Sequence, residues 1–204
     1  KMRFVSSHLQ LDFNRDMLDI FRVQFQEIAR HPYFTKKRVL DNEDFEVIKE
    51  IIDKIICFKS NSKGFARTEE KLREFQNAQG SDKYPDPVAN YLYDILRCQV
   101  VLFEIDFNAL FLDVENYLRR VFDVLQKRYK IIRIKDKRHT PLKNITINIV
   151  YQCIVCEIQI CIYGSAWEEA HITKQHFSYE LRRSGNVDNI ITYLSRLPEI
   201  RAFE

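Results

Sequence analysis

Residues 153–162 form an apolar run that two polar side chains, Glu157 and Gln159, interrupt, and this run constrains the fold more than any other segment. Side chains of a β-strand point alternately to its two faces. The run therefore has one apolar face, whereas Glu157 and Gln159 share the other. A buried carboxylate costs several kcal/mol unless a cation or a hydrogen-bond donor meets it. The segment therefore predicts a strand with a candidate site on its polar side.

Length and composition bound the class of protein. The 204 residues can form one large domain or two small ones with a sizeable core. Hydrophobic residues at 46% and charged residues at 30% are ordinary for a globular protein. Only 4 glycines are present, which argues against glycine-rich phosphate loops. A net charge of +3 is too small for a surface that coats a nucleic-acid duplex, so nucleic acid is not an expected partner.

The cysteines indicate the compartment. Their odd number, mostly within apolar runs, is typical of reduced thiols in an intracellular protein, and we expect a cytoplasmic one. The spacing of Cys153 and Cys156 is found in metal sites, but alternation along a strand places their sulfurs on opposite faces. No second Cys/His pair follows at zinc-finger spacing. No apolar run is long enough to span a bilayer.

Residues 1–60 are predicted to form an N-terminal helical segment. Apolar residues recur close to a 3.6-residue period between Asp12 and Arg30, which predicts a first helix. Asp41 or Asn42 can cap a second helix, and its apolar stripe ends at Ile56. We expect a second domain over residues 61–204, beginning with a loop and a charged helix over 67–77.

After the linker at residues 80–87 the pattern changes to alternating strands and helices. We predict a strand over 95–105, an amphipathic helix over 107–127, a strand over 130–135 and a basic loop over 136–140. A hairpin over 145–162 with its turn near Gln152 follows, and then helices over 166–183 and 187–194. This order predicts an α+β fold with a mixed β-sheet of about four to five strands flanked by helices.

Four polar residues gather near the ends of two predicted strands: Asp94, Arg97, Glu157 and Gln159. If these strands are neighbours, the two carboxylates converge at one edge of the sheet. Carboxylate oxygens are ligands that suit Mg²⁺. The alternative is structural, with Asp94 contacting Arg97 and Glu157 paired to a lysine.

Two basic clusters form a second constellation. Lys63, Arg67 and Lys71 are spaced by four residues, which places them on one face of a helix. In the second cluster, over residues 127–138, strand alternation places Arg133 and Lys135 on one face and Ile132 and Ile134 on the other. Together the two clusters could bind a polyphosphate. The alternative is an ordinary solvated surface.

Five short motifs follow one another over about residues 63–183: Lys63–Lys71, Tyr93–Arg97, Arg133–Arg138, Glu157–Gln159 and His176–Arg182. Their order and spacing resemble the RelA/SpoT nucleotidyltransferase family, the synthetase domain that makes guanosine tetra- and pentaphosphate. The resemblance implies a nucleotidyltransferase fold for residues 61–204. It also implies in-line transfer of pyrophosphate from ATP to a guanine nucleotide.

The resemblance further implies a role for each matching residue. Asp94 would bind Mg²⁺, and Glu157 would work beside the metal and help to activate the attacking ribose hydroxyl. The phosphate and nucleotide contacts would come from Lys63, Lys71, Arg133, Lys135 and Gln159, and we expect Arg67 of the first basic cluster to add to them.

The chain departs from the family pattern at three positions. Leu142 stands where the family has a tyrosine that stacks on the acceptor base. Cys161 stands where the family has an arginine, and Arg67 replaces a serine. Losing an acceptor contact and a phosphate contact should weaken substrate and transition-state binding by several kcal/mol.

These departures predict a non-catalytic RelA/SpoT-like domain. We expect it to act as a structural or interaction module in a larger assembly with protein partners, with residual binding of Mg²⁺ or a nucleotide such as ATP. The alternative is a divergent Mg²⁺-dependent enzyme that transfers pyrophosphate from ATP to a nucleotide acceptor. A plain nucleic-acid binder is disfavoured because no exposed aromatics interleave with the basic cluster.

Overall fold

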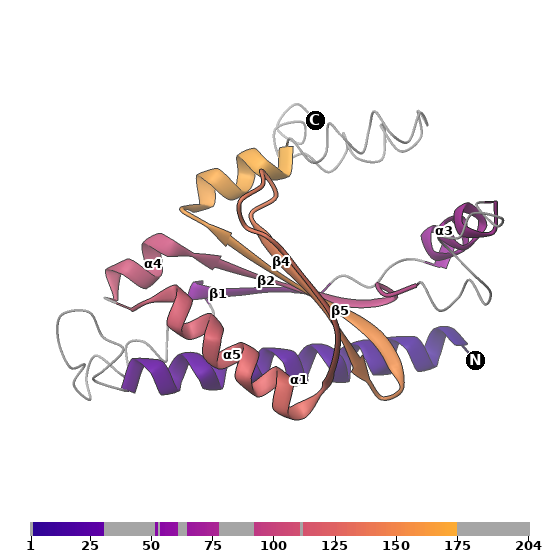
Figure 1. Cartoon of the computed structure of the whole chain (residues 1–204), viewed down its shortest axis with the longest axis horizontal. Coiled ribbons are helices and arrows are strands. Elements are labelled where there is room, and N and C mark those ends of the chain that lie inside the picture. Colours follow the sequence, from indigo (N-terminus) through magenta and orange to yellow (C-terminus); the bar gives the residue numbers. More distant parts are fainter. Residues whose placement is uncertain are drawn as a thin grey trace, which may run out of the picture. The chain divides into compact units, whose positions relative to one another are not determined.

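The structure, a computed structural model, describes residues 2–30, 52, 54–60, 65–77, 92–110 and 112–174 (Figure 1). The chain divides into two units, Lys1–Gly164 and Ser165–Glu204. In its described residues, the first unit contains a five-stranded sheet and the helices α1 (Met2–Arg30), α3 (Phe65–Asn77), α4 (Glu104–Ala109) and α5 (Val114–Arg128). The predicted division into residues 1–60 and 61–204 stays a prediction.

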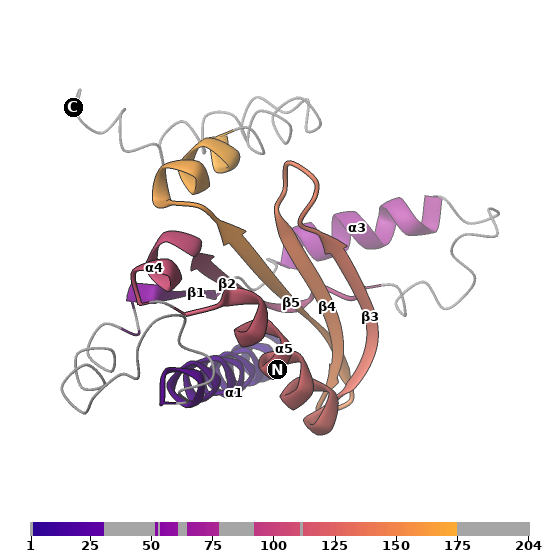
Figure 2. The same ribbon diagram turned by 60° about the vertical axis from the view of Figure 1, so that its left-hand side comes forward.

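The sheet has the strand order β1-β2-β5-β4-β3 (Figure 2). The parallel pair of β2 and β5 lies among antiparallel pairs, so the sheet is mixed and the predicted α+β fold is confirmed. The bounds of the strands are β1 (Ile56–Ser60), β2 (Leu96–Phe103), β3 (Lys130–Lys137), β4 (Asn144–Tyr151) and β5 (Ile154–Tyr163).

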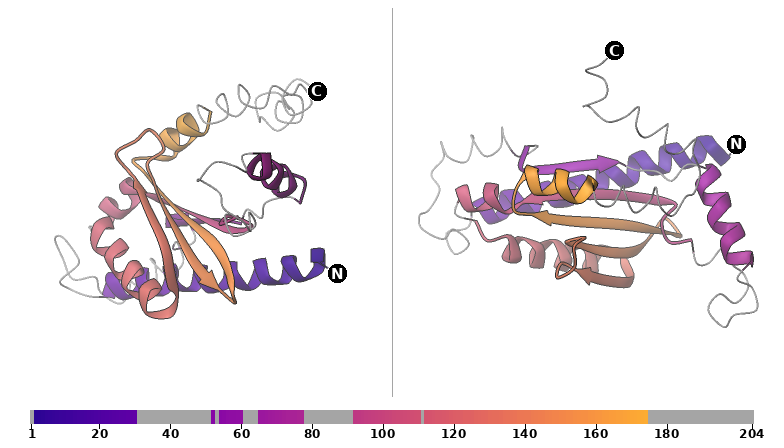
Figure 3. Two further views of the ribbon diagram at one scale, coloured as in Figure 1. Left: turned by 45° about the vertical axis from the view of Figure 1, so that its right-hand side comes forward. Right: turned by 90° about the horizontal axis from the view of Figure 1, so that it is seen from above.

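Helices α1 and α5 cover one face of the sheet, which we call the core face (Figure 3). The helix predicted from Asp12 is confirmed, and it extends back to Met2. Its apolar stripe is buried against α5, where Tyr117 contacts the rings of Phe21 and Phe25. The buried Tyr117 hydroxyl donates to the carbonyl oxygen of Phe21 at 3.0 Å, which satisfies its one polar group. The 3.6-residue period therefore identified the packed side of α1 correctly.

The amphipathic helix predicted over residues 107–127 is divided in two. Helix α4 ends at Ala109, and α5 begins at Val114 with Asp113 as its N-cap. The Asp113 carboxylate accepts the N–H of Glu115 at 2.9 Å, which gives the new helix a partner for one of its free donors. The apolar period continues across this break because both helices contribute to the same core.

Strand β1 is a second correction. The sequence placed Ile56 at the end of a helical apolar stripe, but Ile56 begins β1 and pairs with Leu102. Its side chain is buried on the core face. A run of isoleucines is compatible with both a buried helix and a buried strand, so the pairing with β2 decides the conformation.

The predicted hairpin is confirmed as β4 and β5. Its turn consists of Gln152 and Cys153, which have positive φ angles of 45° and 65°. Two such residues in a two-residue loop are characteristic of a type I′ hairpin turn. Cys153 therefore lies in the turn rather than in the strand. All five cysteines are free thiols, and Cys153 is exposed whereas Cys156 is buried.

The second unit is described over residues 165–174, where residues 166–174 are helical. Trp167 stacks on His171 with their ring centroids 5.5 Å apart. The remainder of the predicted 166–183 helix, the His176–Arg182 motif and the 187–194 helix lie outside the described residues. In the described part of the chain, no helix combines the length and apolarity that crossing a membrane requires.

Candidate functional site

Strands β2 and β5 are neighbours, which was the condition for the predicted site. They pair in parallel with Arg97 opposite Glu157 and Gln99 opposite Gln159. Paired residues of adjacent strands present their side chains on the same face of a sheet. These four residues therefore share the face opposite the core face, because their neighbours in sequence, such as Cys98 and Ile158, belong to the core.

The same register continues across β4 and β3. Asn148 of β4 lies opposite Glu157, and Arg133 of β3 lies opposite Asn148. A second row lies two residues further along each strand. Across β2, β5, β4 and β3 it consists of Gln99, Gln159, Thr146 and Lys135. We call the set formed by these two rows the polar face: Arg97, Gln99, Arg133, Lys135, Thr146, Asn148, Glu157 and Gln159. The sheet thus brings together residues that are up to 62 positions apart in sequence.

Asp94 lies just before β2 and is held by a lysine. The Nζ atom of Lys71 in α3 lies 3.0 Å from each carboxylate oxygen of Asp94. The pair is largely shielded from water, since the side chains are 26% exposed for Lys71 and 13% for Asp94. The same Nζ lies 5.7 Å from the centre of the Phe75 ring, which adds a cation–π contact. The sequence predicted both residues for the site but did not predict that they pair with each other.

The charges of Asp94, Lys71 and Arg97 act on Glu157. Burial of its carboxyl raises the pKa of Glu157, and the negative charge of Asp94 raises it further. A hydrogen bond from Gln159 Nε2 at 2.8 Å and the charges of Arg97 and Lys71 offset part of this rise. The two carboxylates therefore interact, as the prediction of a converging pair required.

The segment that carries Asp94 is fixed by side chains from two other elements. The side-chain amide of Gln10 in α1 bonds both backbone groups of Arg97, donating to its carbonyl at 3.0 Å and accepting its N–H at 3.3 Å. Asn148 donates to the carbonyl of Tyr93 at 3.3 Å. Gln10 and Asn148 are both buried, so these bonds replace water as the partner of polar backbone groups. Neither residue was predicted from sequence.

The predicted phosphate ligands are described to different extents. Arg133 and Lys135 share one face of β3, as predicted, and this face is part of the polar face. Within the described part of the chain, neither forms an ion pair. Arg67 belongs to the first turns of α3, four residues before Lys71. Lys63 lies outside the described residues. The binding roles of all these residues stay predictions.

The isoleucines of β3 do not fill the opposite side of the strand as predicted. Ile132 forms a bulge, since the register shifts between Ile131 and Arg133. Ile134 faces the core side opposite Ile147. Even so, Ile132 is 43% exposed and Ile134 is 45% exposed. The cause is the position of β3 at the edge of the sheet, where one side of the strand has no neighbouring strand in the described part of the chain.

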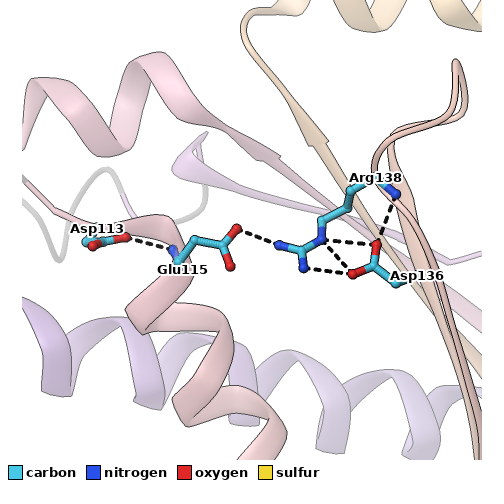
Figure 4. A network of polar contacts seen from close by, with 4 residues as sticks. All are labelled: Asp113, Glu115, Asp136 and Arg138. Atoms are coloured by element: carbon cyan, nitrogen blue, oxygen red, sulfur yellow. Dashed lines mark hydrogen bonds and ion pairs between the residues drawn. The ribbon is translucent and has the colours of Figure 1, made fainter.

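Arg138, from the predicted basic cluster, forms ion pairs that lie outside the polar face (Figure 4). Its guanidinium binds the carboxylate of Asp136 at 2.7 Å and that of Glu115 in α5. The hydrogen bond from Arg138 holds the pKa of Asp136 below its usual value. The end of β3 is thereby joined to the start of α5, and the predicted loop at Asp136 and Lys137 is part of the strand.

The positions that depart from the family pattern are also placed by the structure. The Cys161 thiol accepts a hydrogen bond from Gln99 Nε2 at 3.2 Å, beside the polar face. Leu142 lies in the turn between β3 and β4, where its N–H donates to the Thr140 hydroxyl. Neither side chain supplies a positive charge or an aromatic ring at its position.

A Mg²⁺ ion would need carboxylate oxygens that are open to it. Both oxygens of Asp94 are bound by Lys71, so a metal would have to displace this lysine. Glu157 offers one further carboxylate, of which Oε1 accepts from Gln159. Among the described residues, no group of three or more His, Cys, Asp or Glu side chains is arranged to hold a metal. The present arrangement thus favours the lysine over a cation at Asp94, and the predicted Mg²⁺ binding stays a prediction.

No protein-family model matches the chain, and no curated protein matches its sequence. Among solved structures, the chain is similar to the small alarmone synthetase 1 of Bacillus subtilis, solved with its product pppGpp. The identity is 15% and the TM-score is 0.43, over 77% of this chain and 85% of that chain. A likeness of this size assigns no activity, so the functional assignment depends on the chain's own side chains.

Proposed function

We propose that the chain is a non-catalytic, RelA/SpoT-like domain that binds an anionic ligand such as a nucleotide polyphosphate on its polar face. In this proposal it serves as a structural or interaction module of a larger assembly in the cytoplasm. Residues 61–204 would form the nucleotidyltransferase-like domain, and the preceding residues 1–60 would support it.

The ion pair of Lys71 with Asp94 carries the non-catalytic part of the proposal. A metal-dependent transfer needs Asp94 for the cation and Lys71 for the phosphates. When each neutralises the other at 3.0 Å, neither is available for that task. Because the pair is mostly shielded from water, separating it leaves a poorly solvated charge on each side, which is unfavourable.

Arg133 and Lys135 support the binding part of the proposal. They project from successive same-face positions of β3, opposite Asn148 and Thr146 of β4. Guanidinium and ammonium groups form charge-assisted hydrogen bonds with phosphate oxygens. Lys63 and Arg67, the other basic residues predicted from sequence, would add to this site.

One observation favours a second candidate, a divergent pyrophosphokinase that uses Mg²⁺ and ATP. Glu157 has a raised pKa beside a second carboxylate, and a general base works best when its pKa is moved toward the working pH. In this candidate Mg²⁺ binding frees Lys71 from Asp94, and Lys71 then contacts a phosphate. The acceptor would be a nucleotide.

Two measurements separate these candidates. Thermal-shift assays with ATP, GTP, GDP and inorganic tripolyphosphate, each with and without Mg²⁺, test binding. We expect a rise in melting temperature that Arg133→Gln and Lys135→Gln abolish. Lys127→Gln, an exposed position of α5 that loses the same charge, should leave the shift unchanged.

Transfer is tested by incubating the chain with Mg²⁺, γ- and β-labelled ATP and a mixture of nucleotide acceptors. The non-catalytic proposal expects no labelled product. Formation of a labelled nucleotide that Asp94→Ala and Glu157→Gln both abolish would establish the pyrophosphokinase instead. No thermal shift with any of these anions would reject the binding proposal and leave only the structural module.

A further inference from the structure

Strand β3 has the features of a docking edge. It is the last strand of the sheet and is eight residues long. In the described part of the chain, β4 is the strand that pairs with it, so its outer row of backbone N–H and C=O groups has no strand partner there. An edge of this length can accept an additional strand through main-chain hydrogen bonds.

The two faces of β3 carry different kinds of side chain. Four basic residues share one face of β3, because their partners on β4 alternate with core residues: Lys130, Arg133, Lys135 and Lys137 lie opposite Val150, Asn148, Thr146 and Asn144. The acidic residue of β3, Asp136, lies on the other face, and Arg138 neutralises it. Ile134 is also on that other face and is about half exposed. An added strand would therefore meet positive charge on one face and apolar surface on the other.

This pattern selects against a second copy of the same chain. Pairing two β3 edges would place basic side chains next to basic side chains, and like charges on adjacent strands destabilise a sheet. The edge lysines also resist such self-association. The complementary strand carries acidic residues at alternate positions and apolar residues between them.

We propose that the β3 edge binds an extended acidic peptide of a partner protein, which adds to the sheet as a sixth strand. Its acidic residues would meet Lys130, Lys137 and the basic residues between them, and its apolar residues would cover Ile132 and Ile134. This surface gives the interaction role a location and a partner chemistry. It shares Arg133 and Lys135 with the proposed anion site, whereas Lys130, Lys137 and the isoleucines belong to the peptide surface alone.

The test compares two labelled peptides with identical composition, one with glutamate and valine in strict alternation and one with all glutamates before all valines. Both carry the same charge, but only the alternating peptide can present acids and valines on opposite faces of a strand. Fluorescence polarisation with the 204-residue chain should give an affinity for the alternating peptide that is roughly ten-fold higher or more. Amide hydrogen exchange should slow within Lys130–Lys137 when it binds.

Variants of exposed residues identify the surface. Ile132→Asp and Ile134→Asp should each weaken the alternating peptide about ten-fold. Ile105→Asp is the matched control, because Ile105 of α4 is equally apolar and is 58% exposed, and it should leave affinity unchanged. The double substitution Lys130→Glu with Lys137→Glu should reverse the preference toward an alternating lysine–valine peptide.

Several results would overturn the proposal. Equal affinity for the two glutamate peptides would show that charge attraction alone acts. Slower amide exchange outside β3 but not within it would place the peptide elsewhere. Unchanged affinity of the Ile134→Asp variant for the alternating peptide would do the same. Binding of neither peptide would remove the docking edge, whereas the thermal shift with nucleotides would be unaffected by that outcome.

Discussion

The two faces of the sheet are built from the same strands but hold opposite chemistry. On the core face, Ile147, Ile158 and Val100 are fully buried beneath α1 and α5. On the polar face, the residues next to them in sequence include Asn148, Glu157 and Gln99. Alternation along each strand thus assigns stability to one face and the candidate site to the other. A substitution on the core face should therefore change mainly the free energy of unfolding, and one on the polar face mainly binding.

The largest expected effect belongs to the core face. Tyr117→Ala removes an aromatic ring that contacts Phe21, Phe25 and Phe107 and leaves a cavity. We expect the free energy of unfolding to fall by about 3–5 kcal/mol in urea denaturation. The fraction that remains folded should keep its affinity for tripolyphosphate. A fall below about 1 kcal/mol would mean that α5 does not pack on α1 as described.

Gln10 tests whether the two faces are linked, because it extends from α1 to the backbone that carries the site. Gln10→Leu removes two hydrogen bonds and leaves the N–H and C=O of Arg97 without these partners. The expected loss is about 2 kcal/mol, together with weaker ligand binding, since Asp94 lies three residues away. Gln26→Leu in the same helix is the matched control. Equal effects of the two substitutions would show that the Gln10 bonds do not position the site.

The Lys71–Asp94 pair should contribute less to the free energy of unfolding than the core side chains do. Lys71→Met removes the lysine that binds both oxygens of the shielded Asp94 carboxylate, which we expect to cost about 1–2 kcal/mol. Removing this positive charge should also raise the pKa of Glu157, because Lys71 holds it down. A double-mutant cycle with Asp94→Asn measures the coupling by urea denaturation. Additive effects of the two substitutions would contradict the pairing and favour a metal at Asp94.

Replacing Glu157 should give the smallest change in stability, and the size of this change should depend on pH. Its folded pKa is raised, so protonation stabilises the folded state, and this contribution is lost as pH rises through the folded pKa. Glu157→Gln cannot ionise but can still accept the hydrogen bond from Gln159. We expect its melting temperature to exceed that of the parent chain at pH 7 and to match it below about pH 4. A difference that stays constant with pH would contradict this cause.

Local patterns predicted most of the secondary structure. The 3.6-residue period identified α1 and α5, and alternation identified β5 and the side to which Glu157 points. The main exceptions are Ile56 in β1 and the break at Asp113. Two smaller ones are Asp136, which lies in β3 rather than in a loop, and Cys153, which lies in the hairpin turn rather than in the strand. An apolar run such as that before Ile56 suits a helix and a strand alike, and the continuous period across Asp113 hid its capping role.

The candidate site was predictable as a set of residues but not as an arrangement. Charge and alternation pointed to Asp94, Glu157, Arg133 and Lys135. They could not show that Lys71 binds Asp94, because the pair joins residues 23 positions apart on separate elements. Gln10 gave no signal, since a glutamine in an amphipathic helix resembles any surface residue. Its role follows from a contact with a strand 87 residues later.

The sequence by itself determined which side chains share a face, because the two-residue period of a strand is a local property of the backbone. Tertiary structure decided which strands are neighbours and which face is covered. The parallel pairing of β2 with β5 places Arg97 beside Glu157, and α1 and α5 cover the apolar face. Both results depend on contacts between residues far apart in the chain, where the burial of apolar surface and the register of backbone hydrogen bonds select one arrangement.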